Sequence, residues 1–296
     1  MAFGSGLPLA GSSLGGFGTA SAVAARARRE NFPVASRLLA GRSREQLMAI
    51  YGFARLADDI GDEADGDRLQ LLDSLEAELE RAATGGASHP VLQRLSPVIG
   101  ELELQVEPFH CLIEANRMDQ RVSRYETYDD LVAYCMLSAA PVGRLVLAVF
   151  DSSTPERIAL SDRVCIGLQI VEHLQDVGED AKAGRIYLPQ DDLARWSCDE
   201  ADLLASSSSP AVRRVVFEEA GRARALLASG VPLARTLGAR ARVAVCGFAA
   251  GGLAALDSVD RARGDVLAVR CRPRPTTFAR RAVAAMLSAT LRPGLV

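Results

Sequence analysis

Two pairs of aspartates have the spacing that places side chains together on one face of an α-helix. Asp58 and Asp62 lie in the stretch RLADDIGDE, and Asp176 and Asp180 lie in HLQDVGED. Residues i and i+4 are one helical turn apart, so each pair brings two like charges together and costs roughly a few tenths of a kcal/mol on an exposed helix, more if buried. Carboxylates suit Mg²⁺, which usually binds through a few of them together with substrate phosphates. The sequence therefore predicts a magnesium and diphosphate site between two facing helices, with all four aspartates as metal ligands.

Other polar residues share or border these two helix faces at 100° per residue. They are Tyr51, Arg55 and Asp59 near the first pair, and Gln169, Glu172, His173 and Gln175 near the second. The same faces interrupt otherwise apolar helices, so we expect them to point into the interior of the protein.

Three arginines can donate charge-assisted hydrogen bonds to phosphate oxygens: Arg37, Arg55 and Arg185. Arg185 follows the second pair in the glycine-containing loop KAGRIYLPQDDL, where a lid over a diphosphate is expected. A simpler interpretation stays open for each residue. Arg55 has the spacing to pair with a neighbouring aspartate, and Arg185 and Tyr187 have the position to anchor the loop.

Helical periodicity dominates the chain, and strand-like alternation is nearly absent. Helices are expected at about 34–61, 67–83, 89–100, 108–120, 127–150, 155–181, 210–237 and 240–263, the fifth interrupted by Pro141 and Gly143. A Gly/Ser-rich leader occupies residues 1–30 and an Arg/Pro-rich tail residues 266–296. Because no linker or repeat divides residues 31–265, the sequence predicts one all-α domain.

Composition excludes several classes of function. The net charge of −3 and the lack of a basic, aromatic stripe argue against nucleic-acid binding. Six cysteines without CxxC spacing indicate reduced thiols, and three scattered histidines do not form a zinc motif. The leader lacks a signal peptide's basic and apolar regions, and the apolar stretch 243–256 contains three glycines and is shorter than the ~20 residues of a span. We expect a soluble cytoplasmic protein. If it contacts the inner face of a membrane, we expect the arginines of the tail to make that contact.

Three segments together resemble the squalene/phytoene synthase family. YGFARLADDIGDE is similar to its first aspartate-rich motif, LQIVEHLQDVGEDAKAGRIYLP to its second, and YCMLSAAPVG to the Tyr-Cys segment between them. The resemblance covers about residues 30–265 in the family's motif order. ENFPVASRLL, ANRMDQRVSRYETYDDLVAYC and EHLQDV resemble in particular the hydroxysqualene synthases of bacterial hopanoid biosynthesis.

The resemblance implies an all-α isoprenoid-synthase bundle whose acidic helices face each other across a central apolar cavity. It implies Mg²⁺ bridging the four aspartates to the leaving group of presqualene diphosphate, a C30 substrate made by a sister enzyme of the hopanoid pathway. Ionisation, rearrangement and capture of the carbocation by water would give hydroxysqualene, without NADPH. Tyr134 occupies the position of the family's tyrosine, where an aromatic ring can stabilise a cation; without the resemblance it would be interpreted as a core tyrosine.

Two departures from the wider family bear on the reaction. This chain has Glu172 where many members have Asn, and Gln175 where many have Arg. The additional carboxylate and the lost phosphate contact argue against condensation of two prenyl diphosphates, and Glu172 or His173 is a candidate to orient the capturing water. The alternatives are presqualene diphosphate, squalene or phytoene synthase. A non-catalytic helical partner is disfavoured by the four aspartates, and a membrane-bound structural protein by the lack of an expected span.

Overall fold

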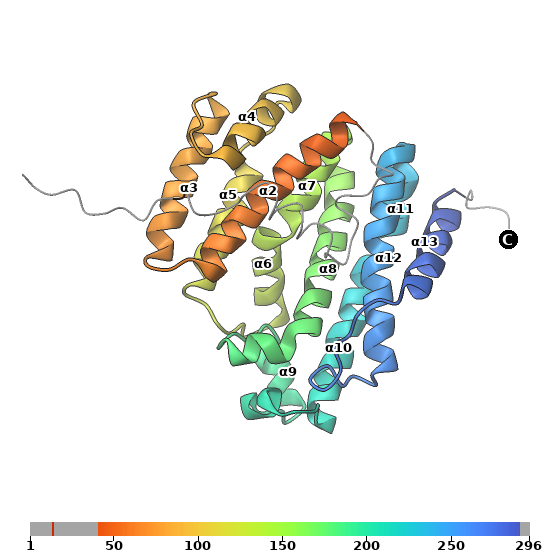
Figure 1. Cartoon of the computed structure of the whole chain (residues 1–296). Helices are drawn as coiled ribbons and strands as arrows, with labels where there is room; N and C mark the ends of the chain where they lie inside the picture. Colours follow the sequence, from red (N-terminus) through yellow and green to blue (C-terminus); the bar gives the residue numbers. More distant parts are fainter. Residues whose placement is uncertain (1–13, 15–40, 291–296) are drawn as a thin grey trace, which may run out of the picture.

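The computed structural model describes Leu14 and residues 41–290, and within them the chain forms helices and no β-strand (Figure 1). The α-helices are α2 (Arg42–Glu63), α3 (Arg68–Ala83), α4 (Pro90–Leu102), α5 (Glu107–Asp119), α6 (Tyr128–Ser138), α7 (Ala140–Val149), α8 (Pro155–Lys182), α9 (Gln190–Arg195), α10 (Pro210–Leu227), α11 (Gly230–Thr236), α12 (Ala239–Arg261) and α13 (Pro275–Thr290), with a 3₁₀-helix η2 at Glu200–Leu204.

Most predicted helices are confirmed to within a few residues, because local signals fix their ends. Asp67 caps α3 by accepting a hydrogen bond from the Gln70 N–H, and Thr127 forms a capping box with Asp130 at the start of α6. The part of the first predicted helix before residue 41, including Arg37, lies outside the described residues, as does almost all of the leader.

Two predicted helices are each two helices in the structure. The segment predicted at 127–150 is divided at Ala139 into α6 and α7, with Pro141 in the first turn of α7. A Cβ at Gly143 would approach the Ser161 Oγ and the Cys165 Sγ to 2.5 Å, so this glycine lets α7 pack closely on α8. The segment predicted at 210–237 breaks after Leu227, and periodicity alone did not show that break.

The helices form two groups, one around α2 and one around α8, and α7 packs in both. Helix α2 packs on α3, α4, α5 and α7, and α8 packs on α6, α7, α10, α11 and α12. In the first group Phe53 and Phe109 are fully buried and meet edge to face, with ring centroids 5.0 Å apart, which fixes α2 on α5. Helix α7 therefore joins the two groups near the middle of the molecule (Figure 1).

Two helical stretches, Tyr128–Val149 and Ala239–Arg261, are long and apolar enough to cross a membrane by length and composition, which differs from the expectation that glycines would rule out a span. Half of the first window and 67% of the second are buried inside the bundle. That burial is typical of core helices in a soluble fold, and α12 packs against α8, α10, α11 and α13.

Candidate active site

All four aspartates line the same cavity, which has a volume of about 330 Å³ and lies between α2 and α8. Helix α2 supplies Asp58 and Asp62, and α8 supplies Asp176 and Asp180. Helices α5 and α6 and the segment after α8 complete the lining, which consists of Arg55, Asp58, Asp62, Leu112, Ala115, Asn116, Asp119, Tyr134, Ser138, Gln169, Glu172, His173, Asp176, Asp180, Arg185 and Tyr187. The structure thus brings together most of the predicted site residues.

The cavity differs in one respect from the apolar hollow that the resemblance implied. Apart from Leu112 and Ala115, its lining is mostly polar or charged. The reason is that the acidic faces of α2 and α8 converge here, together with Asp119 from α5. This cavity is therefore suited to a charged head group rather than to a hydrocarbon chain.

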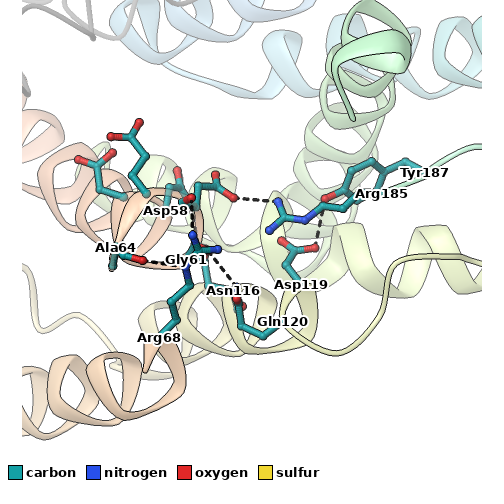
Figure 2. Close-up of polar contacts among 12 residues, drawn as sticks. Asp58, Gly61, Ala64, Arg68, Asn116, Asp119, Gln120, Arg185 and Tyr187 are labelled. Atoms are coloured by element: carbon teal, nitrogen blue, oxygen red, sulfur yellow. Dashed lines mark hydrogen bonds and ion pairs between the residues drawn. The ribbon is translucent and has the colours of Figure 1, made fainter. Parts of the chain in front are cut away.

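The first acidic pair is held by contacts at the end of α2 (Figure 2). The Asn116 amide donates to Asp58 Oδ1 at 3.3 Å, and a Cβ at Gly61 would overlap the Asn116 side chain, so only glycine allows α5 to approach here. Arg68 donates to the last carbonyls of α2, to Ala64 O and Gly61 O at 2.9 Å and to Asp62 O at 3.0 Å. These bonds satisfy carbonyls that a helix end leaves unpaired.

Two arginines lie among the acids. The guanidinium of Arg55 is 2.8 Å from Asp59 Oδ1 and 3.8 Å from Asp58 Oδ2. Arg55 therefore forms the ion pair with neighbouring aspartates of α2 that its spacing allowed. Its Nε is nevertheless buried without a hydrogen-bond partner. Arg185 reaches across the cavity: its Nη1 is 2.8 Å from Asp62 Oδ1, and its backbone N–H donates to the Asp180 carbonyl. Gly184, at φ +84°, allows the chain to turn back at this point.

The carboxylates are short of positive charge. Burial raises the pKa of Asp58 to about 6 even though Arg55 and Asn116 act against the shift, and it raises the pKa of Asp180 to about 7 with a further contribution from Asp176. Asp58 keeps 48% of its side-chain surface accessible because it faces the cavity. Asp62 and Asp180 also lie in the last turns of α2 and α8, where the helix dipole disfavours negative charge.

The residues present fit a divalent cation held together with a phosphate ligand. The available donors are carboxylate oxygens, the type that Mg²⁺ prefers. Among the described residues, no three acidic, histidine or cysteine side chains lie close enough together to enclose an ion by themselves. Water and phosphate oxygens would therefore have to complete the coordination, which is usual for Mg²⁺.

Asp119, which the sequence did not identify as a site residue, organises an aromatic cluster beside the acids. The phenol of Tyr134 donates to Asp119 Oδ2 at 2.7 Å, and that of Tyr187 donates to Oδ1 at 3.1 Å. His173 stacks on Tyr187 with ring centroids 3.8 Å apart. Burial lowers the pKa of His173 to about 3 and raises that of Tyr134 well above its usual value, so the ring is neutral and the phenol keeps its proton.

Two predicted residues are not among those that line the cavity. Tyr51 shares the helical face of Asp58 but lies two turns earlier, roughly 10 Å along the axis. Gln175 is one residue, and thus about 100°, away from the cavity face. Its amide donates to the backbone carbonyl of Cys271 in the segment after α12. The sequence placed both residues at the border of the acidic helix faces, and their contact with substrate stays a prediction.

The fold is that of the all-α isoprenoid synthases, and comparisons with known proteins define the family. A crystal structure of a squalene synthase from Alicyclobacillus acidocaldarius is similar with a TM-score of 0.76 and 39% identity, covering 82% of this chain and 93% of that one. A dehydrosqualene synthase structure matches with a TM-score of 0.81 at 22% identity, over 90% of this chain and 94% of that one, and so supports the fold alone.

The family model for squalene/phytoene synthase matches residues 25–281. A hydroxysqualene synthase of Rhodopseudomonas palustris is 42% identical over 211 residues, 70% of this chain and 71% of that protein. A phytoene synthase of Arthrospira platensis is 34% identical over 210 residues, 66% of this chain and 68% of that protein. The chain belongs to the squalene/phytoene synthase family. It is an enzyme of isoprenoid biosynthesis that resembles the hydroxysqualene synthases, from a family that acts on prenyl diphosphates and is typically Mg²⁺-dependent.

Proposed function

We propose that this enzyme converts presqualene diphosphate into hydroxysqualene. The observation that carries the proposal is that the two acidic pairs face one polar cavity whose negative charge the chain's own arginines do not balance. Mg²⁺ bound to Asp58, Asp62, Asp176 and Asp180 would neutralise the departing diphosphate as a Lewis acid. The hydroxysqualene synthases among its relatives support the choice of substrate.

The chain's own residues then have separate tasks. Arg55 and Arg185 donate to phosphate oxygens, and Arg185 exchanges its contact with Asp62 for one with the diphosphate. Tyr134 presents its ring to the developing cation while Asp119 holds its hydroxyl. Because burial raises the pKa of this phenol well above its usual value, the side chain stays protonated and presents no phenolate to the cation.

Capture by water requires polar groups beside the cation, and α8 places Gln169, Glu172 and His173 in the same cavity. The neutral His173 ring has its Nε2 3.4 Å from the Gln169 amide. We assign Glu172 and His173 to orient the water. The carbon–oxygen bond to the diphosphate breaks, the cyclopropane opens, a new bond forms to the water oxygen, and one proton is released. No step is a reduction, so NADPH is not consumed.

Product identification tests the proposal directly. Purified enzyme is incubated with Mg²⁺ and presqualene diphosphate, with and without NADPH, and the products are identified by mass spectrometry. Hydroxysqualene in both reactions is expected. Squalene formed only with NADPH would identify a squalene synthase, and no conversion would overturn the proposal. Glu172→Ala and His173→Ala proteins that make hydroxysqualene at the parent rate would remove the assignment of those two residues.

The second candidate is condensation of two prenyl diphosphates, which the similarity to phytoene synthases favours. Incubation with farnesyl or geranylgeranyl diphosphate alone distinguishes the two functions. We expect no product, because Gln175, at the position of the family's arginine, donates to Cys271 rather than lining the cavity. Turnover of either substrate alone would favour the condensing activity.

A further inference from the structure

Helix α13 (Pro275–Thr290) lies at the edge of the molecule, far from α3 and α4 (Figure 1). It packs on α11 and α12 through its inner face, where Ala285 and Ala289 join a small core cluster. Alanine on this face brings α13 close to its neighbours. Met286 packs against the same cluster from the border of this face.

The outer face of α13 exposes two large apolar side chains one turn apart. Val283 is 60% exposed and Leu287 56% exposed, the two highest values for large hydrophobic residues in the described part of the chain. Arg280 lies three residues before Val283, and Thr276 lies four residues before Arg280, so both extend the same stripe of the helix. Two exposed apolar residues are ordinary by themselves, so the charge around them decides the interpretation.

The segment that carries this face is basic. Residues 266–290 contain no aspartate or glutamate and five arginines: Arg270, Arg272, Arg274, Arg280 and Arg281. Arg281 is held by Asp257 at 2.6 and 3.0 Å, and Arg280 reaches the same carboxylate at 3.4 Å. Arg270 is 3.7 Å from Glu179, and the charges of Arg270 and Arg272 also act to lower the pKa of Asp176. Arg272 and Arg274 are exposed on the run that leads into α13.

We propose that the outer face of α13 and the arginines that precede it form a docking surface for an anionic phospholipid bilayer. An interfacial helix inserts apolar side chains below the head groups while arginines pair with lipid phosphates, and this surface has both features. A second copy of the chain fits less well, because a two-fold contact through this face would bring the arginines of the two copies together. The proposal does not depend on which prenyl diphosphate the enzyme uses.

Sedimentation of the full-length protein with lipid vesicles tests the surface. Vesicles of phosphatidylcholine alone are compared with vesicles that also contain phosphatidylglycerol, at low and high salt. We expect binding to the anionic vesicles, weakened by salt because the charges are exposed. The double variants Val283→Ser/Leu287→Ser and Arg274→Gln/Arg280→Gln should each weaken this binding by roughly tenfold.

Matched controls come from exposed residues elsewhere. Leu204 in η2 is 54% exposed, and Arg94 is exposed on α4, across the molecule from α13 (Figure 1). Leu204→Ser and Arg94→Gln should bind like the parent, and melting curves would verify that every variant is folded. Equal binding to neutral and anionic vesicles, or undiminished binding by both double variants, would overturn the proposal. A dimer abolished by Val283→Ser/Leu287→Ser, without vesicle binding, would assign the face to a second copy.

Discussion

Glu78 on α3 and Asp58 in the cavity are carboxylates on which burial acts in the same direction, raising the pKa, but the two have different surroundings. Glu78 accepts hydrogen bonds from the His89 N–H at 2.6 Å, from Ser88, and from Arg81. Burial acts to raise its pKa, but these donors outweigh burial and lower the pKa to about 2. In the cavity, burial prevails and the pKa of Asp58 rises to about 6.

The comparison shows which carboxylates belong to the scaffold. Glu78 has all its negative charge balanced by donors of its own chain, so nothing else has to bind there. Asp58, Asp176 and Asp180 face a cavity with too few donors, and such a site favours an external cation. Unbalanced carboxylates in such a cavity lower the stability of the fold, and they are kept because function requires them. The four predictions below test this difference.

The largest effect is expected from removing charge in the cavity. Asp58→Asn and Asp176→Asn should each lower the turnover of presqualene diphosphate by on the order of a thousandfold, because a metal ligand and its transition-state stabilisation are lost. Their melting temperatures should equal or exceed that of the parent, since a repulsive charge is removed. Steady-state kinetics and calorimetry measure the two quantities. Unchanged turnover, or a large fall in stability, would assign these aspartates to the scaffold.

Asp119 should behave as a positioning residue for Tyr134. Asp119→Asn keeps the shape but gives the Tyr134 phenol a weaker acceptor than the carboxylate. We expect kcat to fall by roughly ten- to a hundredfold with little change in KM. A double-mutant cycle with Tyr134→Phe distinguishes positioning from a general loss of structure. The two losses should be strongly non-additive, whereas independent effects would multiply.

The sequence predicted the acidic faces because the i, i+4 spacing survives any packing of the helices. It did not predict Asp119, because a single aspartate near the end of a helix has no local pattern; only the packing of α5 against α6 brings it to Tyr134. The break before α11 was missed because the sequence remains helical in character on both sides. Gln175 does not line this cavity, because adjacent positions on a helix face different neighbours.

Removal of the Glu78 carboxylate should give the opposite result from the cavity variants. Glu78→Gln is expected to destabilise the fold by about 2 kcal/mol, because buried donors lose a charged acceptor. The kcat of the folded protein should be unchanged, since α3 does not contribute to the cavity. Urea unfolding measures the loss. Glu80→Gln on the same helix is the matched control, because Glu80 is exposed and its contact is with His110. It should cost less than ~0.5 kcal/mol.

The smallest expected effect is the change with pH in the stability difference between the parent and Glu78→Gln. The pKa of Glu78 is lowered in the folded protein from 4.5 to about 2, so its contribution to stability is complete above pH 4.5 and is lost as the pH falls toward 2. The gap in unfolding free energy between the parent and Glu78→Gln should therefore be constant from neutral pH to about pH 5 and then close. Urea titrations at several pH values measure it. A gap that does not shrink between pH 4.5 and pH 2 would mean that the Gln variant loses packing rather than charge, and the contrast with the cavity would no longer rest on unpaired carboxylates.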